Sequence, residues 1–514
     1  MDRIWEQRLG FWYIAEDHPD HLAVVSSPDG EWTYGELARR AHRAVHLLRS
    51  RGLAPGDVVA AMLPNGIDLA TLWLACHEGG WYFLPLNTLL TEGEVTAILV
   101  HSDARALVVD EAHAASVAGV DPTRFAGAFV RGKLDGFDSL ASALAAHAPT
   151  PPDDRACGAL FVYTSGTTGR PKGIRRALPP GDPASVAHEA AVFGRAFDFV
   201  PFGGPHLVST AMYHGGSAAY WTGALNVGHP LVIMARFDAE EALRLIDEHR
   251  VFSAYMVPTQ FHRLLQLPDD VRARADVSSL HSVVHSAAPC PLEVKQRMLA
   301  WWGPVVWETY GGMEGPATIA KPHRWLERPG TVGRAIRGTR VAILDDAGRE
   351  LPAGEVGGIY YGSAESSFEY VDDVETTRAA HRGPLFTIGD LGYLDADGYL
   401  FICGREKDMI ITGGVNVYPA EVEATLLAHP AVADVAVIGV PDDEWGETIV
   451  AVVEPVAGHV GDDDLATDLL AHCRVSLAGF KCPRQVEFRA ALPRTDAGKL
   501  AKRPLVDEYA SRRA

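Results

Sequence analysis

The chain has 514 residues, is 47% hydrophobic and 22% charged, and carries a formal net charge of −20 at pH 7. Its length exceeds what one hydrophobic core organises, so we expect several domains or subdomains. The acidic balance, without a long basic block, argues against nucleic acid as a partner, and no segment is apolar for long enough to span a membrane.

Cysteine usage and the first residues indicate the compartment. The six cysteines are scattered, with no CxxC pair, which is typical of a reduced intracellular chain. The start, MDRIWEQRLGFWY, has acidic residues among its apolar ones and lacks the apolar core of a secretory signal. We therefore expect a cytoplasmic protein.

The first part of the chain alternates helix patterns with strand patterns. Residues 33–52 place apolar side chains at helical spacing and end on a glycine, and residues 53–63 give a turn and a short strand. The same order, helix then strand, recurs over residues 67–87, 238–258 and 291–311. This alternation predicts an α/β architecture with largely parallel sheets.

The pattern changes twice further along the chain. Residues 332–362 alternate apolar residues with turn signals, and LGYLDADGYLFICGR (391–405) continues this with an Asp-Gly hairpin turn, which predicts a small barrel-like β subdomain starting near residue 330. After that, helix and strand patterns return in a compact α+β unit. We therefore predict an N-terminal core of residues 1–406 and a mobile C-terminal domain of residues 407–514.

A loop rich in glycine and hydroxyl side chains follows the apolar run GALFV (158–162), which predicts a buried strand. The loop reads YTSGTTGRPKG, from Tyr163 to Gly173, and its backbone N–H groups can turn inward as an anion-binding nest, with Lys172 adding a positive charge. It is not a Walker loop, because Pro171 precedes the lysine and a glycine follows it. Phosphate binding is the favoured function, and a plain surface turn is the alternative.

This loop resembles the signature loop of the adenylate-forming superfamily, which contains acyl-CoA synthetases, amino-acid-adenylating domains and luciferases. Further segments resemble the motifs of that superfamily, in the same order, along nearly the whole chain, and their number argues against a chance match. They are TYGELARRAHRAVHLL, GDVVAAMLPN, LPLNTLLTEGEV, AMYHGG, SAAPCP, TYGGMEG, TIGDLGYLDADGYLFICGREKDMI, GGVNVYPAEVE and PRTDAGKLAKR. The resemblance implies an α/β fold with a large N-terminal domain of αβα-layered subdomains and a small barrel-like one, followed by a small α+β domain.

The resemblance also implies the reaction, in which a carboxylate is joined to the α-phosphorus of ATP and pyrophosphate is released. Both reactants are anionic, so positioning and charge neutralisation would dominate catalysis. Glu314 would bind Mg²⁺ together with Thr164, Lys499 would bridge the carboxylate and the α-phosphate, and His214 would lie beside the acyl pocket. The β- and γ-phosphates would be held by Lys172 and by Thr164, Ser165, Gly166, Thr167, Thr168 and Gly169.

The resemblance assigns the nucleoside to three later motifs. Tyr310 would stack on the adenine, and Asp390 and Arg405 would bind the ribose hydroxyls. Without the resemblance, the tyrosine would be interpreted as a core aromatic residue and the aspartate as a turn residue. The rest of the adenine slot would come from Ala287, Ala288, Pro289, Glu308, Gly311 and Met313.

Met313 departs from the pattern of the superfamily, which usually has threonine immediately before the glutamate of this motif. The substitution removes a hydroxyl expected near the α-phosphate. We expect a neighbouring N–H group or a water to compensate, or the acid substrate to be unusual.

The acceptor of the activated acyl group is a separate question. The resemblance implies that the C-terminal domain rotates about Lys407 and that Gly413 and Gly414 then line a narrow pantetheine tunnel, which favours the thiol of coenzyme A. No carrier domain follows the lysine motif, so a stand-alone ligase is expected, as a monomer or homodimer. The alternatives are an acyl carrier protein or a nitrogen acceptor, as in amide-forming or nitrite-activating relatives. For the acid we predict a hydrophobic or aromatic monocarboxylate without a free α-amine.

Overall fold

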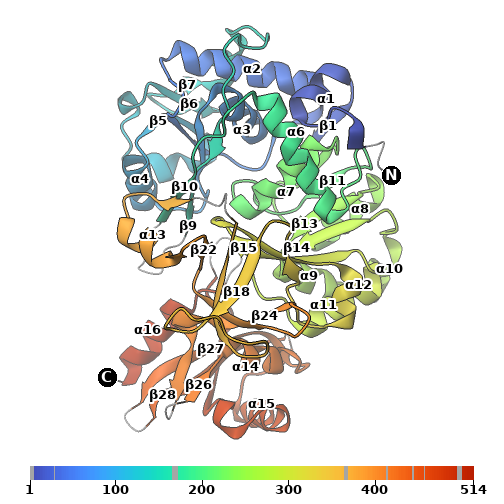
Figure 1. Ribbon diagram of the computed structural model, residues 1–514, viewed down its shortest axis with the longest axis vertical. Coiled ribbons are helices and arrows are strands. Elements are labelled where there is room, and N and C mark those ends of the chain that lie inside the picture. Colours follow the sequence, from blue (N-terminus) through green and yellow to red (C-terminus); the bar gives the residue numbers. More distant parts are fainter. Residues whose placement is uncertain are drawn as a thin grey trace. The chain divides into compact units, whose positions relative to one another are not determined.

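The computed structural model describes residues 5–27, 29–164, 172–363, 368–412, 415–442, 445–456, 458–494 and 500–513 (Figure 1). The chain forms two compact units. Unit 1 comprises Met1–Met256, Gln266–His285 and Ser367–Arg378, and unit 2 comprises Val257–Leu265, Ser286–Ser366 and Ala379–Ala514. The predicted hinge at Lys407 falls within unit 2 and stays a prediction.

The first sheet of unit 1 has six strands in the order β7-β6-β5-β3-β4-β8, all of them parallel. This confirms the parallel arrangement predicted from the alternation of helices and strands. The strands are β3 (Val58–Met62), β4 (Tyr82–Pro85), β5 (Ala104–Asp110), β6 (Gly127–Arg131), β7 (Asp138–Ser139) and β8 (Ala159–Leu160). The connections contain α2 (Tyr34–Ser50), α3 (Ile67–Gly79), α4 (Glu92–His101), η2 (Glu111–Val117), η3 (Pro122–Arg124) and α5 (Leu140–Ala145).

Local sequence signals fix the ends of these helices. Helix α2 begins with a capping box in which the Thr33 side chain accepts from the Glu36 N–H group while the Glu36 carboxylate accepts from the Thr33 N–H group. Helix α4 begins with the same motif. Helix α3 ends at Gly80, whose φ of 81° is the left-handed conformation that glycine adopts at low cost.

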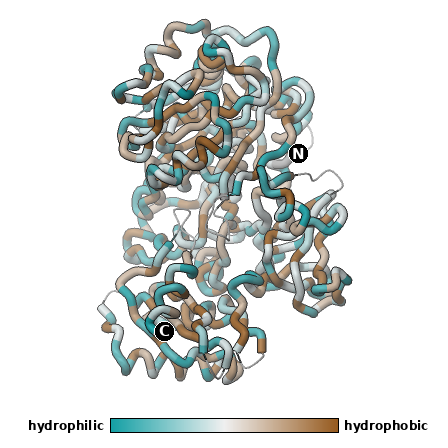
Figure 2. The backbone as a smooth tube through the Cα atoms, turned by 90° about the vertical axis from the view of Figure 1, so that its left-hand side faces the viewer, coloured by the Kyte–Doolittle hydropathy of each residue, from teal (hydrophilic) through white to brown (hydrophobic). Residues whose placement is uncertain are grey.

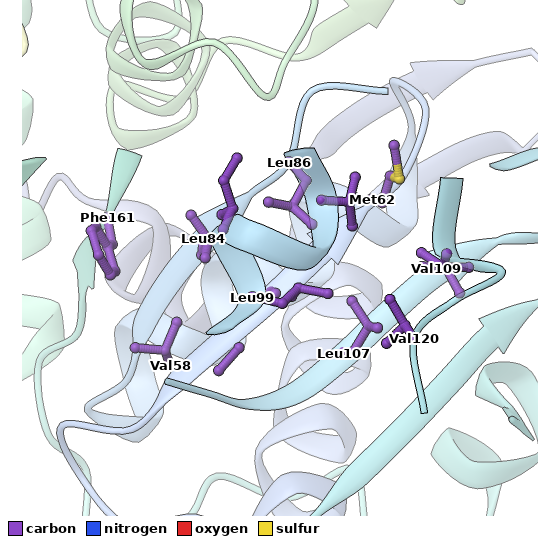
Figure 3. Close-up of a cluster of buried hydrophobic side chains, with 14 of the residues drawn as sticks. Val58, Met62, Leu84, Leu86, Leu99, Leu107, Val109, Val120 and Phe161 are labelled. Carbon is purple, nitrogen blue, oxygen red and sulfur yellow. The ribbon is translucent and has the colours of Figure 1, made fainter. Parts of the chain in front are cut away.

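The core of this sheet is a cluster of buried aliphatic side chains (Figure 3). Every second residue of β3, from Val58 to Met62, packs in this cluster with Val95, Ile98 and Leu99 of α4. Full burial of such a side chain contributes about 1.5–3 kcal/mol. The alternation of a strand and the spacing of a helix therefore meet on one face of the sheet.

The second sheet of unit 1 runs β14-β13-β11-β12-β1-β2 within that unit, and only β1 and β2 are antiparallel. Its strands are β1 (Leu22–Ser26), β2 (Gly30–Thr33), β11 (His206–Val208), β12 (Leu231–Ile233), β13 (Ser253–Met256) and β14 (Ser282–His285). The accompanying helices are α1 (Phe11–Asp17), α6 (Pro183–Gly194), η4 (Arg195–Phe197), α7 (Gly215–Asn226), α8 (Ala239–Glu248) and α10 (Asp269–Arg274).

The third sheet of unit 1 is small and antiparallel, with the order β20-β10-β9. It contains β9 (Val162–Thr164), β10 (Lys172–Arg175) and β20 (Glu369–Tyr370), and α13 (Val374–Ala380) follows β20. The run GALFV, predicted as one strand, is interrupted at Phe161, because β8 pairs with β4 while β9 pairs with β10. Phe161 is 1% exposed and fills the core between the two pairings.

Unit 2 contains the β-rich region predicted from about residue 330, and its antiparallel strands begin earlier, at β15. Strands β15 (Val306–Gly312), β16 (Gly315–Ala320) and β17 (Arg334–Ala335) are antiparallel, and a second antiparallel group contains β18 (Arg340–Leu344), β19 (Gly357–Gly362), β21 (His381–Arg382), β22 (Leu385–Phe386), β23 (Asp390–Leu394) and β24 (Leu400–Arg405). The predicted Asp-Gly hairpin joins β23 to β24. Its helices are α9 (Pro258–Leu265), α11 (Leu292–Trp302) and α12 (Pro322–Glu327).

The last part of unit 2 is the expected α+β element, a sheet covered on both faces. Alternate residues of β27 separate the faces: Val435 and Val437 pack in one core cluster, and Ala436 and Ile438 pack in another with Leu505 of the last helix. The elements are η5 (Glu406–Asp408), β25 (Ile410–Thr412), β26 (Val415–Val417), α14 (Pro419–Leu427), β27 (Val432–Asp442), β28 (Gly446–Pro455), α15 (Asp463–Ser476), η6 (Gly479–Lys481), β29 (Gln485–Phe488) and α16 (Lys502–Arg513).

Hydrophilic and hydrophobic residues are interspersed along the described parts of the chain (Figure 2). Among the described helices, none combines the length and apolar character that a membrane crossing requires.

Candidate active site

Three predicted nucleotide-binding residues meet in unit 2, and we call Tyr310, Asp390 and Arg405 the nucleotide cluster. The Tyr310 hydroxyl donates to Asp390 Oδ2 over 2.8 Å, and Arg405 Nε lies 3.1 Å from Asp390 Oδ1. The sheet sets this geometry, because Asp390 at the start of β23 pairs directly with Arg405 at the end of β24. The tyrosine comes from β15, far away in the sequence.

The nucleotide cluster has a buried end and an open end. Tyr310 is 8% exposed and the Asp390 side chain 8%, whereas the Arg405 side chain is 44% exposed. Burial, followed by the charge of Asp390, raises the pKa of Tyr310 well above its usual value, so the phenol stays protonated and donates. The cluster thus holds a carboxylate whose two oxygens are oriented by different partners.

Met313 and Glu314 form the two-residue loop of the hairpin that joins β15 to β16, in which Gly312 pairs with Gly315. Glu314 is 9% exposed, so it is not the solvated loop carboxylate that the bare sequence allows. A Cβ atom at Gly312 would lie 2.4 Å from Glu314 Oε2, so a larger residue there would have to displace this carboxylate from its present position. Among the described residues, no three Asp, Glu, His or Cys side chains gather as a metal site. Glu314, with Thr164, is predicted to hold Mg²⁺, a cation that prefers carboxylate, hydroxyl and phosphate oxygens.

The predicted adenine-side segment has a strained backbone. Ala287 has a φ of 75°, a conformation that costs a non-glycine residue of the order of 1–3 kcal/mol. Such strain concentrates at ligand sites, which is consistent with the role predicted for Ala287, Ala288 and Pro289. Gly311 also permits a close approach, because a Cβ atom there would lie 2.6 Å from the Gly315 carbonyl oxygen.

Glu308, which the sequence predicts to line the adenine slot, is buried, with 8% of the residue exposed. Its carboxylate is held by Lys295 of α11, with Nζ 2.5 Å from Oε2. The sequence reasoning missed Lys295. Its only signal is a lysine on an apolar stripe of the segment LEVKQRM, where most lysines point to solvent.

In unit 1, Lys172 begins β10 and pairs in register with Thr164 at the end of β9. These two strands therefore bring the two ends of the predicted phosphate loop together. Lys172 Nζ lies 5.2 Å from the centre of the Tyr370 ring, a cation–π contact that holds the side chain at the base of the loop. The loop residues Ser165, Gly166, Thr167, Thr168 and Gly169 lie outside the described residues.

His214 precedes the first residue of α7, and we call residues 210–217 the His214 segment. Asn65 holds it: the Asn65 amide donates to the Thr210 carbonyl over 2.9 Å, and its oxygen accepts from the Met212 N–H group over 2.7 Å. The Thr210 hydroxyl also donates to Ser217 over 2.7 Å. Sequence reasoning missed Asn65, although it ends the quoted segment GDVVAAMLPN.

Aromatic side chains surround the start of α7. Tyr220 and Tyr255 stack with ring centroids 4.5 Å apart and planes at 8°. A Cβ atom at Gly216 would lie 3.0 Å from the Tyr255 hydroxyl, so the glycine lets α7 pack closely against that side chain. Phe197 contacts Tyr220 edge to face at 5.3 Å. All three rings are buried, so the surroundings of α7 are apolar rather than charged.

The remaining predicted residues concern the C-terminal part. Lys407 is exposed in η5, the short turn directly after Arg405. Gly413, Gly414 and Lys499 lie outside the described residues.

Comparisons with known proteins agree on one family. A family model described as "AMP-binding enzyme" matches residues 11–370, and a model of the C-terminal domain of AMP-binding enzymes matches residues 421–499. The chain is 34% identical to a feruloyl-CoA synthase of Amycolatopsis, covering 96% of this chain and 98% of the relative. It is 32% identical to a fatty acid–acyl-carrier-protein ligase of Streptomyces coeruleorubidus, covering 93% of this chain and 91% of that protein.

Solved structures give the same result. ATP-bound MatB from Rhodopseudomonas palustris superposes with a TM-score of 0.84 at 30% identity, covering 98% of this chain and 99% of that one. The amide bond synthetase McbA from Marinactinospora thermotolerans superposes with a TM-score of 0.83 at 25% identity, covering 99% and 98%. The relatives share the fold over their whole length and differ in the acceptor that their names give.

Proposed function

The chain belongs to the AMP-binding enzyme family, and on that premise we propose that it is an AMP-forming ligase that joins a carboxylic acid to the thiol of coenzyme A. The nucleotide cluster carries this proposal. A buried carboxylate with both oxygens oriented, beside an aromatic ring and a half-exposed guanidinium, suits a ribose with two neighbouring hydroxyls.

The first half-reaction forms the acyl-adenylate. The acid's carboxylate oxygen attacks the α-phosphorus of ATP, the bond to the β-phosphate oxygen breaks, and pyrophosphate leaves. Tyr310 would stack on adenine, Asp390 and Arg405 would bind the ribose, and Lys172 would neutralise phosphate charge with the loop that it borders. Mg²⁺, when bound by Glu314 and Thr164, supplies further charge neutralisation to the phosphates. Lys499 would bridge the two reactants during this step.

The second half-reaction transfers the acyl group. The thiol sulfur of coenzyme A attacks the acyl carbon, AMP leaves, and the thiol proton passes to solvent or to a nearby base. Rotation about Lys407 would replace Lys499 by the loop that contains Gly413 and Gly414. The position of Lys407, two residues after the arginine proposed to bind the ribose, supports a hinge that responds to the nucleotide. A reaction that consumes ATP and coenzyme A also supports a cytoplasmic location.

A carrier protein is the second candidate acceptor, and the similarity to an acyl-carrier-protein ligase favours keeping it. Both acceptors present a pantetheine thiol, so the same glycine-lined path would serve them. The similarity to an amide bond synthetase keeps a nitrogen acceptor as a further outcome of the test.

For the acid we propose a hydrophobic or aromatic monocarboxylate. The apolar surroundings of α7, where the stacked rings of Tyr220 and Tyr255 are buried, support an apolar group near the His214 segment. An α-ammonium group would need a buried acidic partner.

The test is ATP-dependent pyrophosphate release across fatty, aryl and amino acids and nitrite, each with and without coenzyme A. Acid-dependent release, with a thioester detected by mass spectrometry only when coenzyme A is present, is the expected result. Release without a thioester would redirect the proposal to a carrier protein or an amine. No release with any acid would overturn it.

Lys499→Ala separates the two half-reactions. The variant should lose adenylate formation and keep thioester formation from a supplied acyl-adenylate, because the lysine acts in one domain orientation only. Equal loss of both half-reactions would contradict the rotation model.

A further inference from the structure

Lys295 and Glu308 form an ion pair in the interior of unit 2. The lysine side chain is 0% exposed and the glutamate side chain 11% exposed. Trp325 of α12 covers the pair, with Lys295 Nζ 4.7 Å from its ring centre. The pair ties α11 to β15, the strand that carries Tyr310.

Such a pair is a costly way to join a helix to a strand. Removing two charges from water costs more than their attraction returns in many proteins, and apolar side chains of similar volume usually serve stability as well or better. Burial opposes both charges here: it lowers the pKa of Lys295 and raises the pKa of Glu308, and each partner counteracts the effect on the other. The pair therefore calls for a reason other than stability.

The position of the Lys295–Glu308 pair gives such a reason. Residues two apart on a strand face the same side, and the strand is regular from Glu308 to Tyr310, because the register shift comes only after Tyr310. Glu308 thus lies beside the ring expected to stack on adenine. An uncompensated carboxylate there would repel a nucleotide that carries several negative charges, and low-dielectric surroundings would strengthen that repulsion.

We propose that Lys295 is a positioning residue for nucleotide binding, which cancels the charge of Glu308 and fixes β15 where it presents Tyr310. The inference rests on the proposed function, because it takes ATP as the ligand of Tyr310. The groups that face Glu308 are Lys295, the Trp325 ring and the Cys290 thiol, whose pKa is raised by burial and then by the charge of Glu308.

The principal variant is Lys295→Met, which keeps the length of the side chain and removes its charge. Binding of Mg·ATP, measured by calorimetry without any acid, should weaken about tenfold or more at about pH 8.5. The loss should be smaller at about pH 6, because burial raises the pKa of Glu308 and a lower pH therefore favours its uncharged form. The KM for ATP should follow the binding constant, while kcat should change less.

The double variant Lys295→Met with Glu308→Gln removes both charges and should bind ATP more tightly than Lys295→Met at about pH 8.5, because no carboxylate is left to repel the nucleotide. It need not reach the affinity of the wild type, because Glu308 is itself predicted to line the adenine slot. Arg155→Met is a matched control. It breaks a partly buried pair of unit 1, in which Arg155 Nε lies 2.9 Å from Glu78 Oε1, and it should lower the melting temperature without changing ATP affinity.

Two results would overturn the inference: unchanged ATP affinity in folded Lys295→Met, or a double variant as weak as the single one at both pH values. The second result would mean that the charge of Glu308 is not what weakens nucleotide binding. If Lys295→Met does not fold, Lys295→Gln takes its place in the same measurements, since it also removes the charge and keeps a hydrogen-bonding group for Glu308. Failure of the proposed function is distinguishable, because the wild type would then bind ATP without releasing pyrophosphate with any acid.

Discussion

The nucleotide cluster of unit 2 and the His214 segment of unit 1 are built from different chemistry. In the nucleotide cluster, a buried carboxylate is oriented by a phenol and a guanidinium over 2.8 and 3.1 Å. In the His214 segment, the backbone is fixed by Asn65, and the helix that follows packs on the buried, stacked rings of Tyr220 and Tyr255. Directed polar contacts suit a ligand that never changes, and shaped apolar space suits one that varies between relatives.

Of the proposed variants, Asp390→Asn should have the largest effect, because it keeps the shape of the nucleotide cluster and removes its charge. Hydrogen bonds to a charged group contribute about 1.5–3 kcal/mol each, so kcat/KM for ATP should fall about a hundredfold. Pyrophosphate release at varied ATP measures this. The KM for the acid, measured at saturating ATP, should stay within a factor of about two; a larger change would show that the carboxylate also serves the acid.

Gly216→Val tests the other region. The new side chain would press on the Tyr255 hydroxyl, which lies 3.0 Å from the first added atom. We expect the KM for a bulky aromatic acid to rise about tenfold or more, with little change for a short acid, since lost pocket volume discriminates by about that factor. The KM for ATP is the internal control. Equal effects on short and bulky acids would place the acid elsewhere.

Tyr310→Phe tests how much the phenol hydroxyl contributes to the nucleotide cluster. It removes the hydrogen bond to Asp390 and keeps the ring, so the KM for ATP should rise about threefold to tenfold. Tyr310→Leu, which loses the ring as well, should weaken ATP binding further. If both variants were equally weak, stacking would contribute nothing and the adenine would have to bind elsewhere.

The smallest expected effect is on the free energy of unfolding, and it comes from a pair of buried histidines in unit 1. Ser253 bridges His206 and His229, and burial lowers the pKa of these histidines to about 3 and about 4. Between those values and about 6.5, the unfolded chain binds more protons than the folded one. The two histidines therefore do not lower the free energy of unfolding above about pH 6.5. As the pH falls below that value, each lowers it by at most about 1.4 kcal/mol per pH unit.

Denaturant unfolding at several pH values checks this. His229→Gln should reduce the slope below about pH 6.5 by up to one proton, because one of the two groups no longer titrates. An unchanged slope would show that other groups dominate the acid sensitivity of the protein.

Much of the fold was predictable because its signals are local. The capping box at Thr33 and the glycine that ends α3 mark helix ends within a few residues. The parallel sheet follows from strands that alternate with helices. The run GALFV shows the limit: apolar character predicted a strand, but the change of partner at Phe161 depends on two sheets formed by distant segments.

The residues of the candidate site also fall into those that the sequence predicts and those that it does not. Tyr310, Glu314, Asp390 and Arg405 were found from the sequence, since each lies in a short motif whose neighbours identify it. Lys295 and Asn65 were not, because a lone lysine or asparagine has no local pattern that reveals its partner.

By itself, the sequence determined the order of the elements, the α/β class, the family and the identity of most candidate ligands, since each rests on contiguous residues. Only the tertiary structure decided which of these side chains meet. Asp390 faces Arg405 through strand register, and Tyr310 reaches the same carboxylate from a separate strand. Lys295 becomes a buried partner of Glu308 only where a helix packs on that strand. Contacts between residues far apart in the chain depend on register and packing, which no short stretch of sequence contains.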